Sequence, residues 1–269
     1  MDADIAQRLI DLNKGFYQKL AGPFSASRER LQPGVMRILE TIPLVASVLD
    51  LGCGNGGVAL ELERRGFAGR YIGLDFTDEL LQIARKGMHE MMSSGMRHAG
   101  RGQHASSYKF TKADLTSDFV SQTEIEGGEF DFVFAFAVLH HIPGREKRVS
   151  FLQQVERLLA KPTAGGSETR PHSTGGVFFH SEWQFLNSER LRERIQPWKT
   201  IGMTKDDVHE GDYLLDWRRE GQGLRYVHHF NEQELEGLAD ESGFYVVKTF
   251  YSNGEGGRLG IYQRWGASA

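Results

Sequence analysis

The sequence predicts an α/β fold with a mostly parallel sheet, and three observations lead to this prediction. From residue 45 onward, short apolar runs alternate with amphipathic stretches, as strands alternate with crossover helices in such folds. Residues 129–139 hold a nearly continuous apolar run, which is typical of a central strand buried on both faces. Near the end of the chain, two apolar runs flank the glycine-rich stretch 252–257, which predicts an antiparallel hairpin.

Two helices are predicted before the first strand. Apolar side chains spaced three and four residues apart predict a helix over Asp4–Leu20, which Gly22-Pro23 should end. A second, short helix is expected over Pro33–Thr41, because proline favours the first helical position and Pro43 stops the helix.

The alternating core is predicted element by element from its apolar runs and breakers. The expected strands are Ser47–Leu51, Arg70–Asp75, Tyr108–Ala113, Glu129–Leu139, Val177–Ser181, Phe244–Tyr251 and Leu259–Trp265. The expected helices run from Val58 to about Gly66, from Glu79 to at least Lys86, over Arg145–Ala160, and from a capping box at Asn231 to Ser242. Residues 163–176 are rich in Gly, Ser and Thr and predict a loop.

Two segments do not follow the alternation. Residues 182–229 hold three of the four tryptophans and balanced charges, which predicts an ordered insertion. Residues 85–112 carry six basic residues against the single acid Glu90. This basic segment is either a solvated helix end with a loop, or a patch that faces phosphates.

Composition excludes several classes of protein. The 269 residues are 39% hydrophobic and 25% charged, which is globular and sufficient for one large domain. The net charge of −4 does not favour binding nucleic acid through bulk charge. There is no membrane-length apolar run and no secretory signal at the start. Cys53 is the sole cysteine, so an intrachain disulfide and a cysteine-based zinc cluster are excluded, and we expect a reduced, cytoplasmic location.

A glycine-rich loop, residues 52–57, follows the first predicted strand. Glycines adopt positive φ and let a ligand approach the backbone closely. Such a loop between a strand and a helix presents N–H groups to an anion. Asp75, at the end of the next strand, can bond two ribose hydroxyls. These features fit NAD, FAD or S-adenosylmethionine (SAM).

Further motifs separate the cofactors. Asp50, two residues before Gly52, would repel a pyrophosphate but suits the ammonium of an amino-acid cofactor. Asp114-Leu115, after the third strand, can bond an adenine amino group. The ordered motifs VLDLGCGNG, IGLD, AD and FD…VLHH resemble those of class I SAM-dependent methyltransferases. This resemblance covers residues 45–183 and the terminal hairpin. It implies SAM as cofactor and a Rossmann-like, seven-stranded, mostly parallel sheet with an antiparallel C-terminal hairpin and helices on both faces.

The resemblance also implies roles for individual positions. Around the methionine part of SAM it places Asp50, Gly52, Cys53, Gly54, Asn55 and Gly56. At the ribose it places Asp75, and at the adenine Phe76, Asp114 and Leu115. On the sulfonium side it places Ala135, Phe136 and Ala137. Phe24 and Phe136 either face the sulfonium or pack in the core. Tyr17 and Arg28 would close over the cofactor from the N-terminal segment, with Arg28 on a carboxylate of the cofactor or acceptor.

His140 and His141 end the last motif. Each is either a core or rim histidine or a group that touches the acceptor, and with Arg28 they are the candidate catalytic residues. Two adjacent histidines without a nearby cysteine or acid triad do not predict a metal site.

A narrower resemblance lies outside the cofactor motifs. The stretch Phe16-Tyr17 with A-G-P-F-S-A-S-R at 21–28 is similar to the tRNA wobble-uridine carboxymethyl methyltransferases. So are GDYLLDWR at 211–218 and RYVHHF at 225–230. Within these segments, Trp217 is a candidate acceptor contact, and Arg218, Arg225, His228 and His229 either recognise an anionic acceptor or form a surface salt-bridge cluster. The eukaryotic members of the family work with a small activator subunit. Here Asp216 replaces the family's proline, and a P-W-P is missing after Arg28.

We therefore expect a single methyltransferase domain over 1–269. Its parts are an N-terminal helical lid (1–44), a SAM-binding core (45–183), an insertion that shapes the acceptor site (184–230), and the last helix with the hairpin (231–269). Three functions remain open: methylation of a tRNA wobble-uridine carboxylate, methylation of a small molecule under a closed lid, and a SAM-binding subunit without turnover. A carboxylate is already ionised at neutral pH and needs no general base, whereas an amine or hydroxyl would need a histidine.

Overall fold

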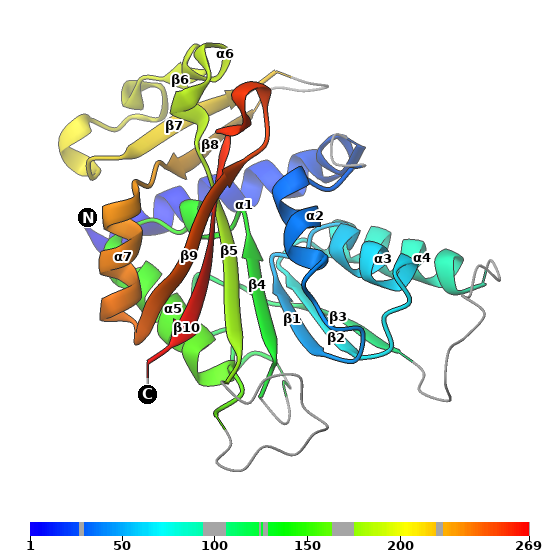
Figure 1. The fold of residues 1–269 in the computed structure, drawn as a ribbon. Helices are drawn as coiled ribbons and strands as arrows, with labels where there is room; N and C mark the ends of the chain where they lie inside the picture. Colours follow the sequence, from blue (N-terminus) through cyan, green and yellow to red (C-terminus); the bar gives the residue numbers. More distant parts are fainter. Residues whose placement is uncertain are drawn as a thin grey trace.

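A computed structural model describes residues 1–26, 30–93, 106–123, 125, 129–162, 175–218 and 223–268, and contains a seven-stranded sheet (Figure 1). Its strands are β1 (Ser47–Leu51), β2 (Arg70–Asp75), β3 (Ser107–Lys112), β4 (Phe132–Phe136), β5 (Val177–Trp183), β9 (Phe244–Ser252) and β10 (Gly260–Ala267). They lie in the order β3-β2-β1-β4-β5-β10-β9. The first five pair in parallel, and β10 runs antiparallel to β5 and β9. The predicted mixed sheet with a C-terminal hairpin is confirmed.

Helices cover both faces of this sheet. On one face lie α2 (Pro33–Leu39), α3 (Gly57–Arg64) and α4 (Asp78–Ser93), and on the other α5 (Arg145–Leu158) and α7 (Glu232–Glu241). Side chains alternate along β1, so Val48 packs towards α2 and α3 while Leu49 and Leu51 pack towards α5 and α7. Each face of the sheet is thus buried in an apolar layer, which is the main source of the fold's stability.

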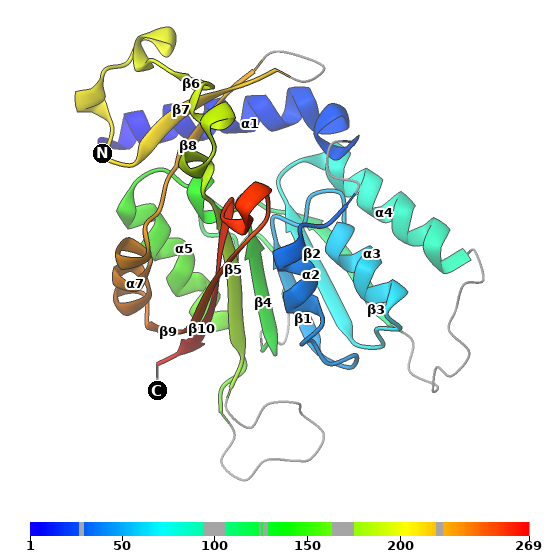
Figure 2. The ribbon, with the colours of Figure 1, turned by 45° about the horizontal axis from the view of Figure 1, so that its top comes forward.

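The remaining elements form a roof over one end of the sheet. α1 (Ala3–Ala26) lies beside a three-stranded sheet, β6 (Ile195–Gln196), β7 (Asp212–Trp217) and β8 (Gly223–His228), as both ribbon views show (Figures 1 and 2). Leu9 of α1 packs with Leu214 and Tyr226 of these strands. The short helix α6 (Glu189–Arg192) precedes β6. The segment that breaks the strand–helix alternation is therefore an ordered antiparallel sheet.

Two predicted boundaries are clearly wrong, at the end of α1 and at the end of the central strand. α1 does not end at Gly22-Pro23 but continues to Ala26 after a kink at Leu20 (φ −116°, ψ 19°). Pro23 follows the kink within the first turn of the new helical segment, where its missing N–H needs no partner. α4 runs to Ser93, in agreement with the prediction of a helix to at least Lys86.

The second wrong boundary is the end of the central strand. β4 stops at Phe136 rather than at Leu139, because Ala137 has a positive φ of 59° and turns the chain into a short 3₁₀ helix, Leu139–His141. Most of the predicted loop (residues 163–174) and the middle of the basic segment (residues 94–105) lie outside the described residues.

Within the described helices, none combines the length and the apolar character needed to cross a membrane.

Candidate active site

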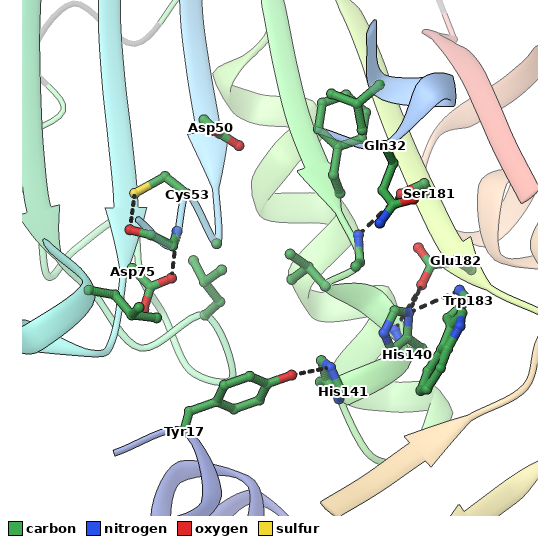
Figure 3. Close-up of a pocket in the computed structure, with 18 of the residues that line it drawn as sticks. Tyr17, Gln32, Asp50, Cys53, Asp75, His140, His141, Ser181, Glu182 and Trp183 are labelled. Atoms are coloured by element: carbon green, nitrogen blue, oxygen red, sulfur yellow. Dashed lines mark hydrogen bonds and ion pairs between the residues drawn. The ribbon is translucent and has the colours of Figure 1, made fainter. Parts of the chain in front are cut away.

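A cavity of about 470 Å³ lies at the carboxyl ends of β1, β2, β4 and β5, under α1 (Figure 3). The topology explains its position. The chain runs outward from β1 to β2 and β3, then returns to β4 on the other side of β1. The loops after β1 and β4 therefore diverge and leave a crevice between them, where open α/β sheets bind their ligands.

The glycine-rich loop forms one wall of this cavity. Gly52 and Gly54 have φ values of +75° and +55°, which side chains rarely adopt. The N–H groups of Gly52 and Cys53 donate to the Leu74 carbonyl at 2.8 and 2.9 Å, which holds the loop against β2. A Cβ at position 54 would meet no atom within 4 Å, so a side chain there would enter the open space of the cavity. A ligand can therefore approach the Gly54 backbone closely.

Asp50 contributes a buried carboxyl group to the same wall. Its side chain is 2% exposed and accepts a hydrogen bond of 2.6 Å from the Tyr71 hydroxyl. Burial raises the pKa of Asp50 to about 7; the Tyr71 hydrogen bond opposes this rise and the nearby Asp75 adds to it. A cation bound beside Asp50 would stabilise its charged form.

Asp75, at the end of β2, braces the loop. Its two oxygens accept hydrogen bonds of 2.9 Å from the N–H groups of Gly54 and Thr77. Burial raises its pKa, although these backbone donors oppose the rise. Each oxygen keeps a further lone pair, so the carboxylate can also accept from two ligand hydroxyls.

Asp114 lies on the rim and is tied to α1. Lys14 donates to its Oδ2 at 2.6 Å, and Thr116 donates to Oδ1 through its N–H and its hydroxyl. Partial burial alone would raise the pKa of Asp114, but these donors outweigh burial and lower it. The carboxylate is therefore ionised, and α1 is fastened to this side of the cavity.

His141 is held between α1 and β8. Its Nδ1 lies 3.2 Å from the Tyr226 carbonyl, which can only accept, so Nδ1 carries the hydrogen. Its Nε2, 2.7 Å from the Tyr17 hydroxyl, is then the acceptor of the tyrosine O–H. Figure 3 shows this contact across the cavity. Both ring nitrogens of His141 are occupied.

His140 is paired with a buried acid. Glu182 Oε2 lies 2.7 Å from its Nδ1, and Oε1 lies 3.0 Å from His180 Nδ1. Burial raises the pKa of Glu182 well above its usual range. The Oε2 of Glu182 also accepts a hydrogen bond of 3.0 Å from the His140 backbone N–H, and the Trp183 N–H lies 3.4 Å from His140 Nδ1. The buried carboxyl group therefore holds the His140 ring in place from its Nδ1 side.

Most of the predicted site residues meet in this cavity. Those that line it are Tyr17, Asp50, Gly52, Cys53, Gly54, Asn55, Asp75, Phe76, Asp114, Leu115, Phe136, Ala137, His140, His141 and Arg225. Two predicted positions do not line it: Gly56 is the N-cap of α3, packed against Ala84, and Ala135 is fully buried within β4. Arg28 and the side chain of Phe24 lie outside the described residues.

Four predicted acceptor contacts lie away from the cavity, so we withdraw the expectation of direct contact for them. Trp217 packs edge-on against Phe16. Arg218 is exposed and bonds Asp216 at 2.8 Å. His228 is buried between Asp212 and Glu234, and His229 packs on Phe185. In each case the side chain contacts other residues of the protein instead of the cavity.

Other lining residues were missed from the sequence, among them Asn13, Lys14, Gln32, Ser181, Glu182, Trp183 and Asn253. Some left a signal. Trp183 was noticed only as one of the tryptophans of the insertion, and Asn253 only as part of the hairpin loop. Asn13 and Lys14 carry no local signal, because only the packing of α1 over the sheet brings them to the cavity.

The described residues contain no group of three side chains arranged to ligate a metal ion.

Comparisons with known proteins agree with this arrangement. A family described as methyltransferase domain matches residues 24–249. The tRNA (carboxymethyluridine(34)-5-O)-methyltransferase ALKBH8 of Macaca fascicularis is 27% identical over 146 residues, which are 53% of this chain and 17% of that protein. The enzyme of the same name from Saccharomyces cerevisiae is 30% identical over 151 residues, 56% of this chain and 43% of that protein. The matched part is thus well under two thirds of these relatives.

Solved structures show the same fold. A SAM-dependent methyltransferase from Methanosarcina mazei superimposes with a TM-score of 0.61 at 21% identity, covering 88% of this chain and 98% of the other. The magnesium protoporphyrin IX methyltransferase of Synechocystis, solved with bound S-adenosylhomocysteine, gives a TM-score of 0.55 at 15% identity, covering 98% and 100%.

Proposed function

This chain belongs to the family of methyltransferase domains, and on that premise we propose that it transfers a methyl group from SAM to a carboxylate, the carboxymethyl side chain of a wobble uridine in tRNA. One observation carries the choice of acceptor chemistry. His141 has both ring nitrogens engaged and His140 has its Nδ1 on Glu182, which supports an acceptor that needs no histidine as general base. An acceptor that arrives ionised needs no such base.

The residues of the cavity fit SAM. The ionisable Asp50 suits its ammonium, the open backbone at Gly54 its methionine chain, and the two oxygens of Asp75 its ribose hydroxyls. Phe76 and the ionised Asp114 line the side where an adenine ring and its amino group would lie. SAM supplies a sulfonium methyl group that an anionic nucleophile can displace in line.

The chain's own contribution is to position the acceptor and to exclude water. α1 and the three-stranded sheet close over the cavity, and Tyr17 and Lys14 fasten α1 to its rim. A closed site strengthens the attraction between an acceptor anion and a sulfonium, because water no longer screens it. Holding nucleophile and methyl in line at about 3–3.5 Å supplies much of the rate enhancement.

The tRNA assignment is supported by relatives named as tRNA carboxymethyluridine methyltransferases, and by the segments around Tyr17 and Arg225 that resemble that family. Both residues line the cavity. A small activator subunit and an RNA-facing role for the basic segment remain predictions.

A small carboxylic acid is the second candidate acceptor, because the roof encloses the far side of the cavity: Arg225, which lines it, is 5% exposed. Transfer from tritiated SAM distinguishes the two candidates. Total tRNA and a small-molecule extract are offered as separate acceptor pools, with a protein-free control. Alkali-labile label in tRNA is the expected result. Label only in the small-molecule pool would replace the tRNA assignment, and no label in either pool, with SAM bound, would contradict turnover by this chain.

A further inference from the structure

Arg225, on β8, has unusual surroundings for a charged side chain. It is 5% exposed and lines the cavity. Its guanidinium carbon lies 4.8 Å from the centre of the Trp183 ring, 5.4 Å from Phe16 and 5.7 Å from Trp217. Three aromatic faces therefore hold the charge in place, while ring contacts satisfy none of its N–H donors.

No carboxylate pairs with this guanidinium among the residues that the structure describes, and its buried Nε has no hydrogen-bond acceptor there. The strand geometry explains why the nearby acid does not reach it. Arg225 pairs across the sheet with Leu215, so Asp216, the next residue of β7, points to the opposite face and bonds Arg218. Glu182, in the same cavity, is occupied by His140 and His180.

A buried and unpaired cation costs stability, because the lost hydration is not repaid by an anion or a hydrogen bond. The neighbouring Arg148 shows the alternative, since it is just as buried but bonds the Tyr226 hydroxyl and lies near Asp212 and Glu234. The difference between these two arginines indicates that Arg225 is kept unpaired for a ligand.

We propose that Arg225 is the anion anchor of the acceptor half of the cavity, where its guanidinium receives a carboxylate attached to a flat ring. The inference rests on the proposed function and names the group that recognises the acceptor. A guanidinium binds a carboxylate through two parallel hydrogen bonds. Trp183 lines the same cavity and its ring contacts the Arg225 guanidinium, so the ring of the acceptor would lie beside this aromatic side chain.

The test measures binding of two matched probes, uracil-5-acetate and its neutral amide, by calorimetry in the presence of S-adenosylhomocysteine. Wild-type protein should bind the carboxylate and not the amide. Arg225→Met, which keeps the length and apolar bulk of the side chain, should weaken carboxylate binding about tenfold to a hundredfold, as expected for charge-assisted hydrogen bonds. Arg225→Lys keeps the charge without the planar fork and should retain part of the affinity.

Arg218→Met is the matched control, because Arg218 is an exposed arginine near the end of the neighbouring β7. It should leave probe binding unchanged. Thermal unfolding separates ligand binding from a structural role: Arg225→Met should melt at the same temperature as wild type or higher, since an uncompensated buried charge is removed. Lower melting temperature with unchanged probe binding would overturn the proposal.

Two further outcomes would also overturn the proposed role of Arg225. Equal binding of acid and amide by wild type would show that the cavity does not select an anion and would overturn the anchor. If inorganic phosphate binds the wild-type protein more tightly than uracil-5-acetate does, and this binding needs Arg225, the ligand of Arg225 is a phosphate and not a carboxylate. A failure of tRNA labelling together with Arg225-dependent carboxylate binding would remove the tRNA assignment alone, so the two proposals fail separately.

Discussion

We expect Asp50 to make SAM binding dependent on pH. Its folded-state pKa of about 7 lies far above the value of an exposed carboxyl, so the empty protein gains stability from the protonated form, and this gain is lost as pH rises towards 7. An ammonium requires the ionised form. SAM affinity should therefore fall as pH drops below 7, by up to about tenfold per pH unit.

Calorimetry between pH 5.5 and 7.5 checks this dependence, a range in which an α-amino group stays mostly protonated (pKa about 8). Asp50→Asn is the control and should bind SAM weakly with little change across the range. The same slope in Asp50→Asn and wild type would assign the pH dependence to another group.

Gly54 and Asp75 test the cofactor wall directly. Gly54→Arg should abolish SAM binding, because the side chain would enter the open cavity and strain a backbone with positive φ. Gly202→Arg is the matched control: Gly202 has a φ of +69° and open space around it, but it follows a short helix in the roof and does not line the cavity. Asp75→Ala should weaken SAM binding by about tenfold to a hundredfold. Unchanged SAM affinity in both site variants would contradict the assignment of this cavity to the cofactor.

At the scale of elements, a buried polar network joins the roof to the core. Arg148 of α5 is 1% exposed and donates to the Tyr226 hydroxyl of β8 at 2.8 Å and to the Ile142 carbonyl, next to His141, at 2.9 Å. The Oδ1 of Asp212 on β7 lies 3.6 Å from the Arg148 Nη2 and accepts a hydrogen bond from the Tyr226 hydroxyl. Arg148 thereby fixes both β8 of the insertion and the turn that carries the two cavity histidines.

Arg148→Met should destabilise the fold by about 3–5 kcal/mol, because it leaves Asp212 buried without its cation. The free energy of unfolding in urea measures this loss. Arg145→Met, on the same helix, breaks only an exposed pair with Glu241 and should cost at most about 1 kcal/mol. Equal, small losses in both variants would show that the network does not support the roof.

The same elements show what the sequence can predict. β1 and β2 were found correctly because buried strands followed by a glycine loop or an acid leave a local pattern. The continuation of α1 beyond Gly22-Pro23 was not predicted. A kink at Leu20 lets Pro23 stand in the first turn of a new helical segment. The predicted contact of His228 with the acceptor is wrong, because His228 is buried between Asp212 and Glu234. These three residues meet only in the tertiary fold, so the local sequence does not show the burial.

At the scale of the whole molecule, the cavity has a proposed cofactor wall and a proposed acceptor half, and the chain builds these two parts from different regions. The cofactor wall comes from consecutive strands and loops between residues 50 and 116, which is why motifs revealed it. The acceptor half is assembled from α1, β5, β8 and the loop of the final hairpin. Residues such as Glu182, Trp183 and Asn253 meet there only through the tertiary fold, so local patterns could not identify them.

We propose that this molecule methylates a carboxylate that is already ionised when it enters the cavity. The most direct measurement is the identity of the methylated nucleoside, obtained by digesting tRNA after reaction with isotopically labelled SAM and separating its nucleosides by mass spectrometry. We expect a label in the methyl ester of 5-carboxymethyluridine, which mild alkali removes. A label that is stable to alkali, on a ribose hydroxyl or a base nitrogen, would contradict it.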